Sequence, residues 1–110
     1  MDNRKRKRLE SAGWRISGTA EFLRLNHEEA AIVELKLGLA DAVKEKRMRR
    51  RLTQEQLGKF LGSSQSRVAK IEAADRSVSI DLMVRSLIRM GASRQEVASY
   101  IAASGPRRAA

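Results

Sequence analysis

The chain has 110 residues, of which 42% are hydrophobic and only 4% aromatic, so we expect one domain with one modest core of aliphatic side chains. It contains no cysteine, which excludes a disulfide framework and a thiolate metal site and is compatible with a reducing cytoplasm. Its formal net charge of +10 predicts a polyanionic partner, either a nucleic acid or an anionic membrane surface.

The basic residues are concentrated in two segments. Residues 1–15 hold six Lys or Arg against two acidic residues, and residues 44–51 hold six against one. The first segment lacks a periodic apolar pattern, so we interpret it as a flexible basic arm, either a solubilising tail or an arm that follows a DNA backbone. No apolar run follows it or approaches the roughly 20 residues that span a bilayer, so we expect neither a secretory signal nor a transmembrane helix.

A short helix is predicted over 20–23 and a long helix from Asn26 to about Arg50. Glu29, three positions after Asn26, gives the long helix the spacing of a capping box. Within it, apolar residues recur at intervals of three and four, which predicts one buried stripe. The stripe consists of Ile32, Leu35, Leu39, Ala42 and Val43. His27, the only histidine, has no companion ligands and is expected on the surface.

Residues 53–72 have the pattern of two short helices joined by a tight turn. Thr53 and Gln56 form a predicted capping box, and Gly62 stands where the first helix ends in a left-handed residue. Ser64 is the N-cap of the second helix, and Gly58 is small enough for the two helices to cross closely. The apolar residues that lock the pair together are Leu57, Leu61, Val68 and Ile71.

The second of these helices carries polar groups on its outward face. They are Gln65, Ser66, Arg67 and Lys70, whose donors and acceptors suit base edges and phosphates. The sequence therefore predicts a helix-turn-helix that binds double-stranded DNA.

Two further helices follow. Ser79 caps one that runs from Ile80 to Met90 and ends at Gly91, with an apolar side formed by Met83, Val84, Leu87 and Ile88. Ser93 and Glu96 cap the last one, and residues 105–110 are a loose tail. We expect an all-α fold of five or six helices, organised as an arm over 1–15, a helical domain over 16–104 with its helix-turn-helix at 53–73, and the tail.

The segment from about Leu39 to Gly91 resembles the lambda-repressor-like, or XRE-type, helix-turn-helix family. The matching residues are Arg47, Leu52, Thr53, Gln54, Gln56, Leu57, Leu61, Gly62, Ser64, Gln65, Val68, Ile71, Glu72 and the stretch from Leu87 to Gly91. The upstream part, with Glu21-Phe22-Leu23 and Glu34-Leu35-Lys36, resembles small regulators that are often antitoxins of the HigA kind. Three residues depart from the family pattern: Gly58 replaces alanine, Ser63 a small apolar residue and Ala74 a glycine. The first two loosen the motif slightly, and the third suggests a different turn.

The resemblance implies a role for each site residue. Gln65, Ser66 and Arg67 would approach base edges, while Gln54 would touch a phosphate and support Gln65. Arg47 and Glu72 would form a structural ion pair at the edge of the core. The other phosphate contacts are Thr53, Ser64, Lys70, Arg50 and Arg51.

The function predicted from these residues is a sequence-specific repressor that binds a palindromic operator as a homodimer. The alternative is an antitoxin that neutralises an RNA-cleaving toxin and represses its own operon, with the toxin covering apolar residues near Phe22, Leu23 and Leu25 or near Val97 and Tyr100. The dimer surface is expected at Val97, Tyr100 and Ile101 or on the N-terminal helices.

Because no nucleophile with a base, phosphate-binding glycine loop or metal cluster is apparent, we expect no enzyme activity, cofactor or metal. A membrane-surface role is disfavoured because segment 44–51 lacks an aromatic opposite face, and we expect a cytoplasmic, nucleoid-associated protein.

Overall fold

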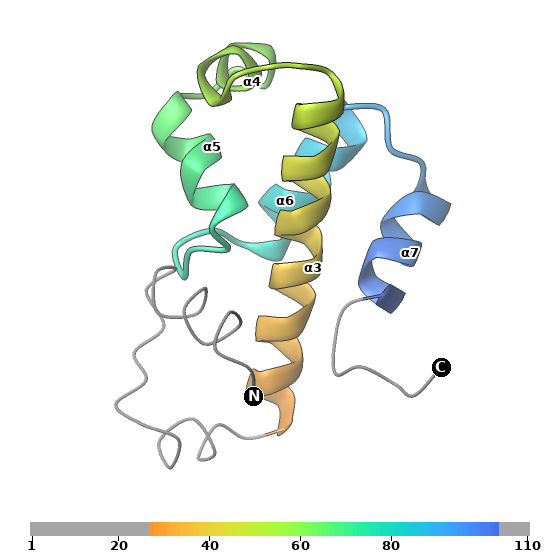
Figure 1. Cartoon of the computed structure of the whole chain (residues 1–110). Coiled ribbons are helices and arrows are strands. Elements are labelled where there is room, and N and C mark those ends of the chain that lie inside the picture. The colour runs from red at the N-terminus through yellow and green to blue at the C-terminus, as the bar shows by residue number, and fades with distance from the viewer. Residues whose placement is uncertain (1–26, 104–110) are drawn as a thin grey trace.

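The computed structural model describes residues 27–103, which form five α-helices arranged around one long helix. The long helix is α3 (His27–Arg49), followed by α4 (Gln54–Phe60), α5 (Gln65–Glu72), α6 (Ile80–Arg89) and α7 (Arg94–Ala103). Helices α5, α6 and α7 each pack on α3, and α4 packs on α5 (Figure 1). The all-α class is therefore confirmed. The predicted arm over 1–15, the short helix over 20–23, the Asn26 cap and the tail over 105–110 lie outside the described residues.

Local hydrogen bonds begin the helices where the sequence predicts. The Thr53 hydroxyl accepts from the Gln56 backbone N–H at 3.0 Å, and the Gln56 side chain accepts from the Thr53 N–H at 2.8 Å, which completes a capping box. Ser64 and Ser79 accept from backbone N–H groups of α5 and α6. Ser93 and Glu96 form a second capping box at α7, with bonds of 2.8 and 3.0 Å.

Helices α3 to α6 all end in the same way. In each, the first residue past the C-cap has a positive φ, and the next N–H reaches back to a carbonyl of the last turn, which is a Schellman motif. These residues are Arg51 (φ 57°), Gly62 (φ 69°), Ala74 (φ 54°) and Gly91 (φ 96°). Ala74 adopts the left-handed conformation that glycine favours, so the turn after α5 has the same form as the turns at Gly62 and Gly91 although its residue is not glycine.

The core lies between α3 and the other four helices. Its largest fully buried side chains are Leu39, Val43, Leu57, Val68, Ile71, Met83, Leu87 and Met90. These include most of the residues predicted to lock α4 onto α5, and Leu61 packs against them half-buried. Both helices of the predicted helix-turn-helix are thus anchored by their apolar sides, which leaves their other sides to the surface.

The predicted apolar stripe of α3 is wrong in its first half. Ile32 is 44% exposed and Leu35 only half-buried, whereas Val33, Lys36 and Leu37 are buried. Apolar residues occur at nearly every second position of this half, so their spacing does not select one face, and packing against the other helices decides it. For the same reason Ile88, expected on the apolar side of α6, is 50% exposed.

Candidate nucleic-acid interface

The start of α5 lies directly against α4 at Gly58. A Cβ atom at Gly58 would lie 2.8 Å from the Ser64 carbonyl carbon and 2.9 Å from its oxygen, well inside van der Waals contact. The Ser63 N–H also donates to the Gly58 carbonyl at 2.7 Å. Gly58 therefore permits the close approach, and Gly62 provides the left-handed residue that reverses the chain between the two helices.

Helix α5 has two distinct sides. Val68 and Ile71 are buried in the core, whereas the predicted polar strip of Gln65, Ser66, Arg67 and Lys70 is exposed along its whole length. The side chains that suit base edges and phosphates are thus accessible to a ligand, on a helix whose opposite side is fixed.

Arg47 and Glu72 join the long helix to the end of α5. Arg47 Nε donates to Glu72 Oε2 at 2.6 Å, and its Nη2 donates to Oε1 at 3.2 Å, so the pair is bidentate. A third N–H of Arg47 reaches the Leu52 carbonyl at 2.8 Å. The side chains are only 15% and 5% exposed, which makes this ion pair part of the packed interior.

Gln54 connects this buried pair to the surface strip. Its Nε2 donates to Glu72 Oε1 at 3.1 Å, and its Oε1 accepts from Gln65 Nε2 at 2.7 Å. A carboxylate only accepts hydrogen bonds, so Glu72 orients the Gln54 amide, and Gln54 in turn orients the amide of Gln65. We call these four side chains, Arg47, Glu72, Gln54 and Gln65, the polar relay.

The predicted phosphate contacts differ in how far their side chains are engaged. Arg51 is exposed in the turn between α3 and α4. Thr53 and Ser64 use their hydroxyl oxygens as cap acceptors and keep their O–H groups as donors. Arg50 instead donates to the Met90 carbonyl at the C-terminal end of α6. This contact gives Arg50 a structural partner that its basic neighbours did not suggest.

Two contacts between distant parts of the chain were not predicted from the sequence. One is the Arg50–Met90 contact, which joins residues 40 positions apart and leaves no local signal. The other is Lys36, whose ammonium is buried between α3 and the loop after α5. Its signal in the sequence was a lone lysine among apolar residues of a long helix.

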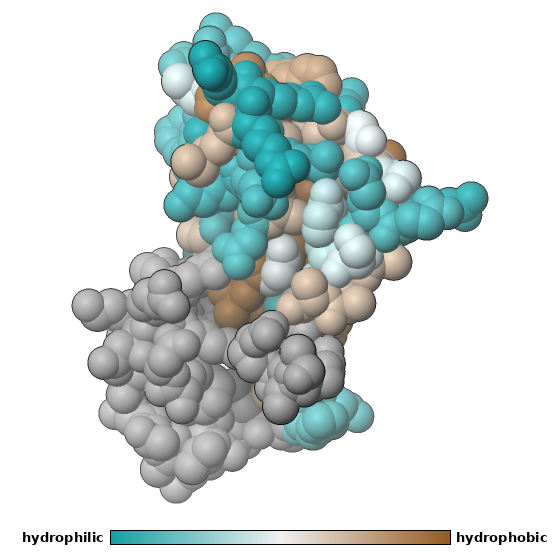
Figure 2. Space-filling view, turned by 45° about the vertical axis from the view of Figure 1, so that its right-hand side comes forward, coloured by the Kyte–Doolittle hydropathy of each residue, from teal (hydrophilic) through white to brown (hydrophobic). Residues whose placement is uncertain are grey.

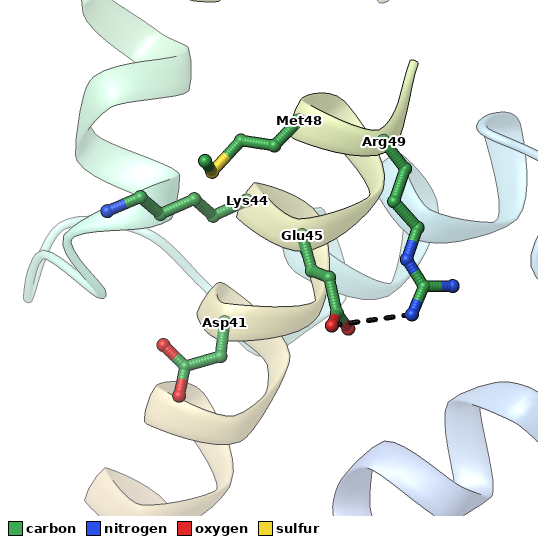
Figure 3. Close-up of a pocket in the computed structure, with 5 residues that line it drawn as sticks. All are labelled: Asp41, Lys44, Glu45, Met48 and Arg49. Atoms are coloured by element: carbon green, nitrogen blue, oxygen red, sulfur yellow. Dashed lines mark hydrogen bonds and ion pairs between the residues drawn. The ribbon is translucent and has the colours of Figure 1, made fainter. Parts of the chain in front are cut away.

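A shallow hollow on α3 is separate from the polar strip. Asp41, Lys44, Glu45, Met48 and Arg49 line it, all from one exposed side of the helix (Figure 3). Arg49 and Glu45 form an exposed i, i+4 ion pair of 3.5 Å across it. With walls from a single helix, it does not enclose a ligand.

The surface of the described part carries little else that suggests a ligand. Hydrophilic side chains cover most of the upper half of the face in Figure 2, away from the grey residues. Among residues 27–103, no group of three or more His, Cys, Asp or Glu side chains is placed to hold a metal ion. Within the same range, each helix is too short or too polar to cross a membrane.

Comparison with known families agrees with a helix-turn-helix formed by α4 and α5. Residues 43–85 match the family HTH_3, described as a helix-turn-helix. The match covers the second half of α3, the whole of α4 and α5, and the first part of α6. No curated protein and no solved structure matches the chain.

The matched segment is a helix-turn-helix domain of the XRE type. Domains of this class bind DNA, so DNA is the partner that the match implies. This class typically has no enzymatic activity.

Proposed function

We propose that this protein is a sequence-specific transcriptional repressor that binds a palindromic operator as a homodimer. Helix α5 enters the major groove of each half-site, and polymerase is excluded from the promoter by the bound protein. The two recognition helices of a dimer would meet half-sites about one helical turn, or roughly 34 Å, apart.

The observation that carries this proposal is the polar relay. Gln65 is exposed, but its amide is oriented by Gln54 and, through it, by Glu72, whose side chain is only 5% exposed. A side chain that reads a base needs its donor and acceptor fixed before it meets the DNA, because ordering it on binding costs free energy. The relay supplies that order from the interior of the domain.

The direction of the relay also predicts which base Gln65 prefers. One N–H of its amide is donated to Gln54, which leaves the second N–H as a donor and Oε1 as an acceptor. Adenine presents N7 as an acceptor and N6–H as a donor in the major groove, so this amide matches adenine. A good bidentate pair of this kind discriminates against other bases by about 1–3 kcal/mol.

Basic and hydroxyl side chains would supply affinity without base preference. Arg51, before α4, and Lys70, on α5, are both exposed. Thr53 and Ser64 keep hydroxyl donors at the starts of α4 and α5. Contacts of this type release counterions from the DNA, so we expect binding to weaken steeply with salt.

Selection of binding sites from random duplexes tests the proposal, with the unaltered chain, Gln65→Ala and Lys70→Ala compared at one salt concentration. The affinity of each chain for the selected duplex is then measured over a series of salt concentrations. The unaltered chain should select an inverted repeat with adenine at one position of each half. Gln65→Ala should lose preference there, while Lys70→Ala should weaken all sequences alike and reduce the salt slope by about 1. A Gln65→Ala variant that selects the same sites as the unaltered chain would contradict the reading of bases by Gln65.

The antitoxin alternative depends on the resemblance of the upstream stretch. Val97, one of the residues expected to meet a toxin or a second subunit, is buried in the core, and Tyr100 and Ile101 are half-buried against it. Of the candidates named for the toxin surface, Phe22, Leu23 and Leu25 lie outside the described residues. Co-purification with the product of an adjacent gene tests this alternative, and failure to co-purify argues against it.

A further inference from the structure

Lys36 is a buried cation that the helix-turn-helix itself does not contain. It lies on α3, seven residues before the matched segment begins, and the residue is only 6% exposed. Its ammonium donates to the Asp75 carbonyl at 3.2 Å and to the Arg76 carbonyl at 3.5 Å, in the loop that connects α5 with α6 (Figure 1). Burial lowers the pKa of Lys36, although the nearby Asp75 carboxylate acts in the opposite direction.

The two carbonyls that Lys36 binds follow a strained residue. Ala74 has φ 54°, a left-handed conformation in which the Cβ of an L-residue lies too close to the backbone. The turn is held by N–H bonds from Ala74 to the Ile71 carbonyl and from Asp75 to the Lys70 carbonyl. Both acceptor carbonyls belong to the last turn of α5, so hydrogen bonds join the loop turn directly to the end of that helix.

The same last turn of α5 carries Glu72. Glu72 orients Gln54 and, through it, Gln65, so a change in the backbone of this turn would reach the amide that faces the DNA. The loop carbonyls are therefore linked to Gln65 by a continuous set of hydrogen bonds and one helical turn.

We propose that Lys36 is a positioning residue for base recognition: its ammonium clamps the carbonyls of Asp75 and Arg76, keeps Ala74 in the left-handed turn, and so fixes Glu72 and the polar relay. The part of α3 that precedes the matched segment then contributes to base recognition by α5. This inference rests on the proposed function for its effect on DNA, but the clamp itself concerns the free protein.

Amide hydrogen exchange of the free protein tests the clamp. In Lys36→Met, the N–H groups of Ala74 and Asp75 should exchange about tenfold faster, while those of the core of α6 stay unchanged. The matched control is Lys44→Met, which removes the same charge from an exposed position of the same helix and should alter neither. Should Lys36→Met fail to fold, Lys36→Gln, which keeps an N–H donor, is measured at the same amides and should show a smaller increase.

Rescue by Ala74→Gly distinguishes positioning from charge. Glycine adopts the left-handed turn without strain, so Ala74→Gly in the Lys36→Met background should restore slow exchange and DNA affinity together. Lys36→Met alone should weaken binding to the selected site about threefold or more, with a smaller effect on random DNA.

Three results would overturn parts of this inference, each in a different place. Unchanged exchange at Ala74 and Asp75 in Lys36→Met refutes the clamp whatever the DNA result. An equal loss of affinity for selected and random DNA, without rescue by Ala74→Gly, refutes positioning and leaves a charge effect. Absence of site-specific binding by the unaltered chain refutes the proposed function, and with it the link to base reading, but leaves the exchange result to decide the clamp.

Discussion

Removal of the Arg47 guanidinium should destabilise the domain far more than removal of any exposed charge. Arg47→Met keeps the apolar stem but leaves the Glu72 carboxylate, with 5% of its side chain exposed, without its bidentate partner. It also removes the donor to the Leu52 carbonyl. Stranding a buried charge costs about 3–5 kcal/mol, a large part of the stability of a small domain.

Urea denaturation at neutral pH, followed by circular dichroism, measures this cost. The matched control is Arg49→Met on the same helix, which breaks an ion pair whose side chains are 76% and 64% exposed and should cost only about 0.2–1 kcal/mol. The double variant Arg47→Met with Glu72→Met removes both charges and should recover most of the loss. Equal destabilisation by Arg47→Met and Arg49→Met would refute the reasoning, as would a double variant no more stable than Arg47→Met.

Two further predictions concern the contact of α4 with the start of α5 and the turn that follows α5. Replacement of a helical glycine by alanine usually stabilises a protein by up to about 1 kcal/mol. Gly58→Ala should instead lower the free energy of unfolding, because the new Cβ would lie 2.8 Å from a backbone atom of Ser64 and overpacking costs about 1–3 kcal/mol. A higher Tm in thermal denaturation would contradict this. The second concerns acid. The Ser77 hydroxyl donates a hydrogen bond to the Asp75 carboxylate, and the Ser77 backbone N–H donates a second one. The hydroxyl bond, followed by the backbone bond, holds the pKa of Asp75 below its ordinary value of 3.8. A lowered pKa means that this turn is fully stabilised above pH 3.8 and loses that contribution as the pH falls through the lower folded value. NMR titration of Ser77→Ala should place the loss nearer to pH 3.8 than in the unaltered chain, and identical titration curves would argue against the bond.

The fold class and the helix starts could be predicted because their causes are local. Thr53 and Gln56, or Ser93 and Glu96, lie three residues apart and bond within one turn, so their spacing is visible in the sequence. Gly62 and Gly91 likewise mark helix ends because their left-handed conformation belongs to a single residue. Partners far apart in the sequence gave no such signal unless the family resemblance supplied it, as for Arg47 and Glu72.

The sequence by itself determined where most helices of residues 27–103 begin and end, and that α5 has a polar and an apolar side. Only the tertiary structure decided which face of α3 is buried, because apolar residues such as Ile32 and Val33 occur on both sides of that helix. It also decided that Lys36 binds the loop after α5, that Arg50 binds Met90, and that Ala74 adopts a left-handed turn. Ala74 carried no glycine to mark its turn. The bonds of Lys36 and Arg50 join residues 39 and 40 positions apart, so they depend on which groups meet in space and not on spacing along the chain.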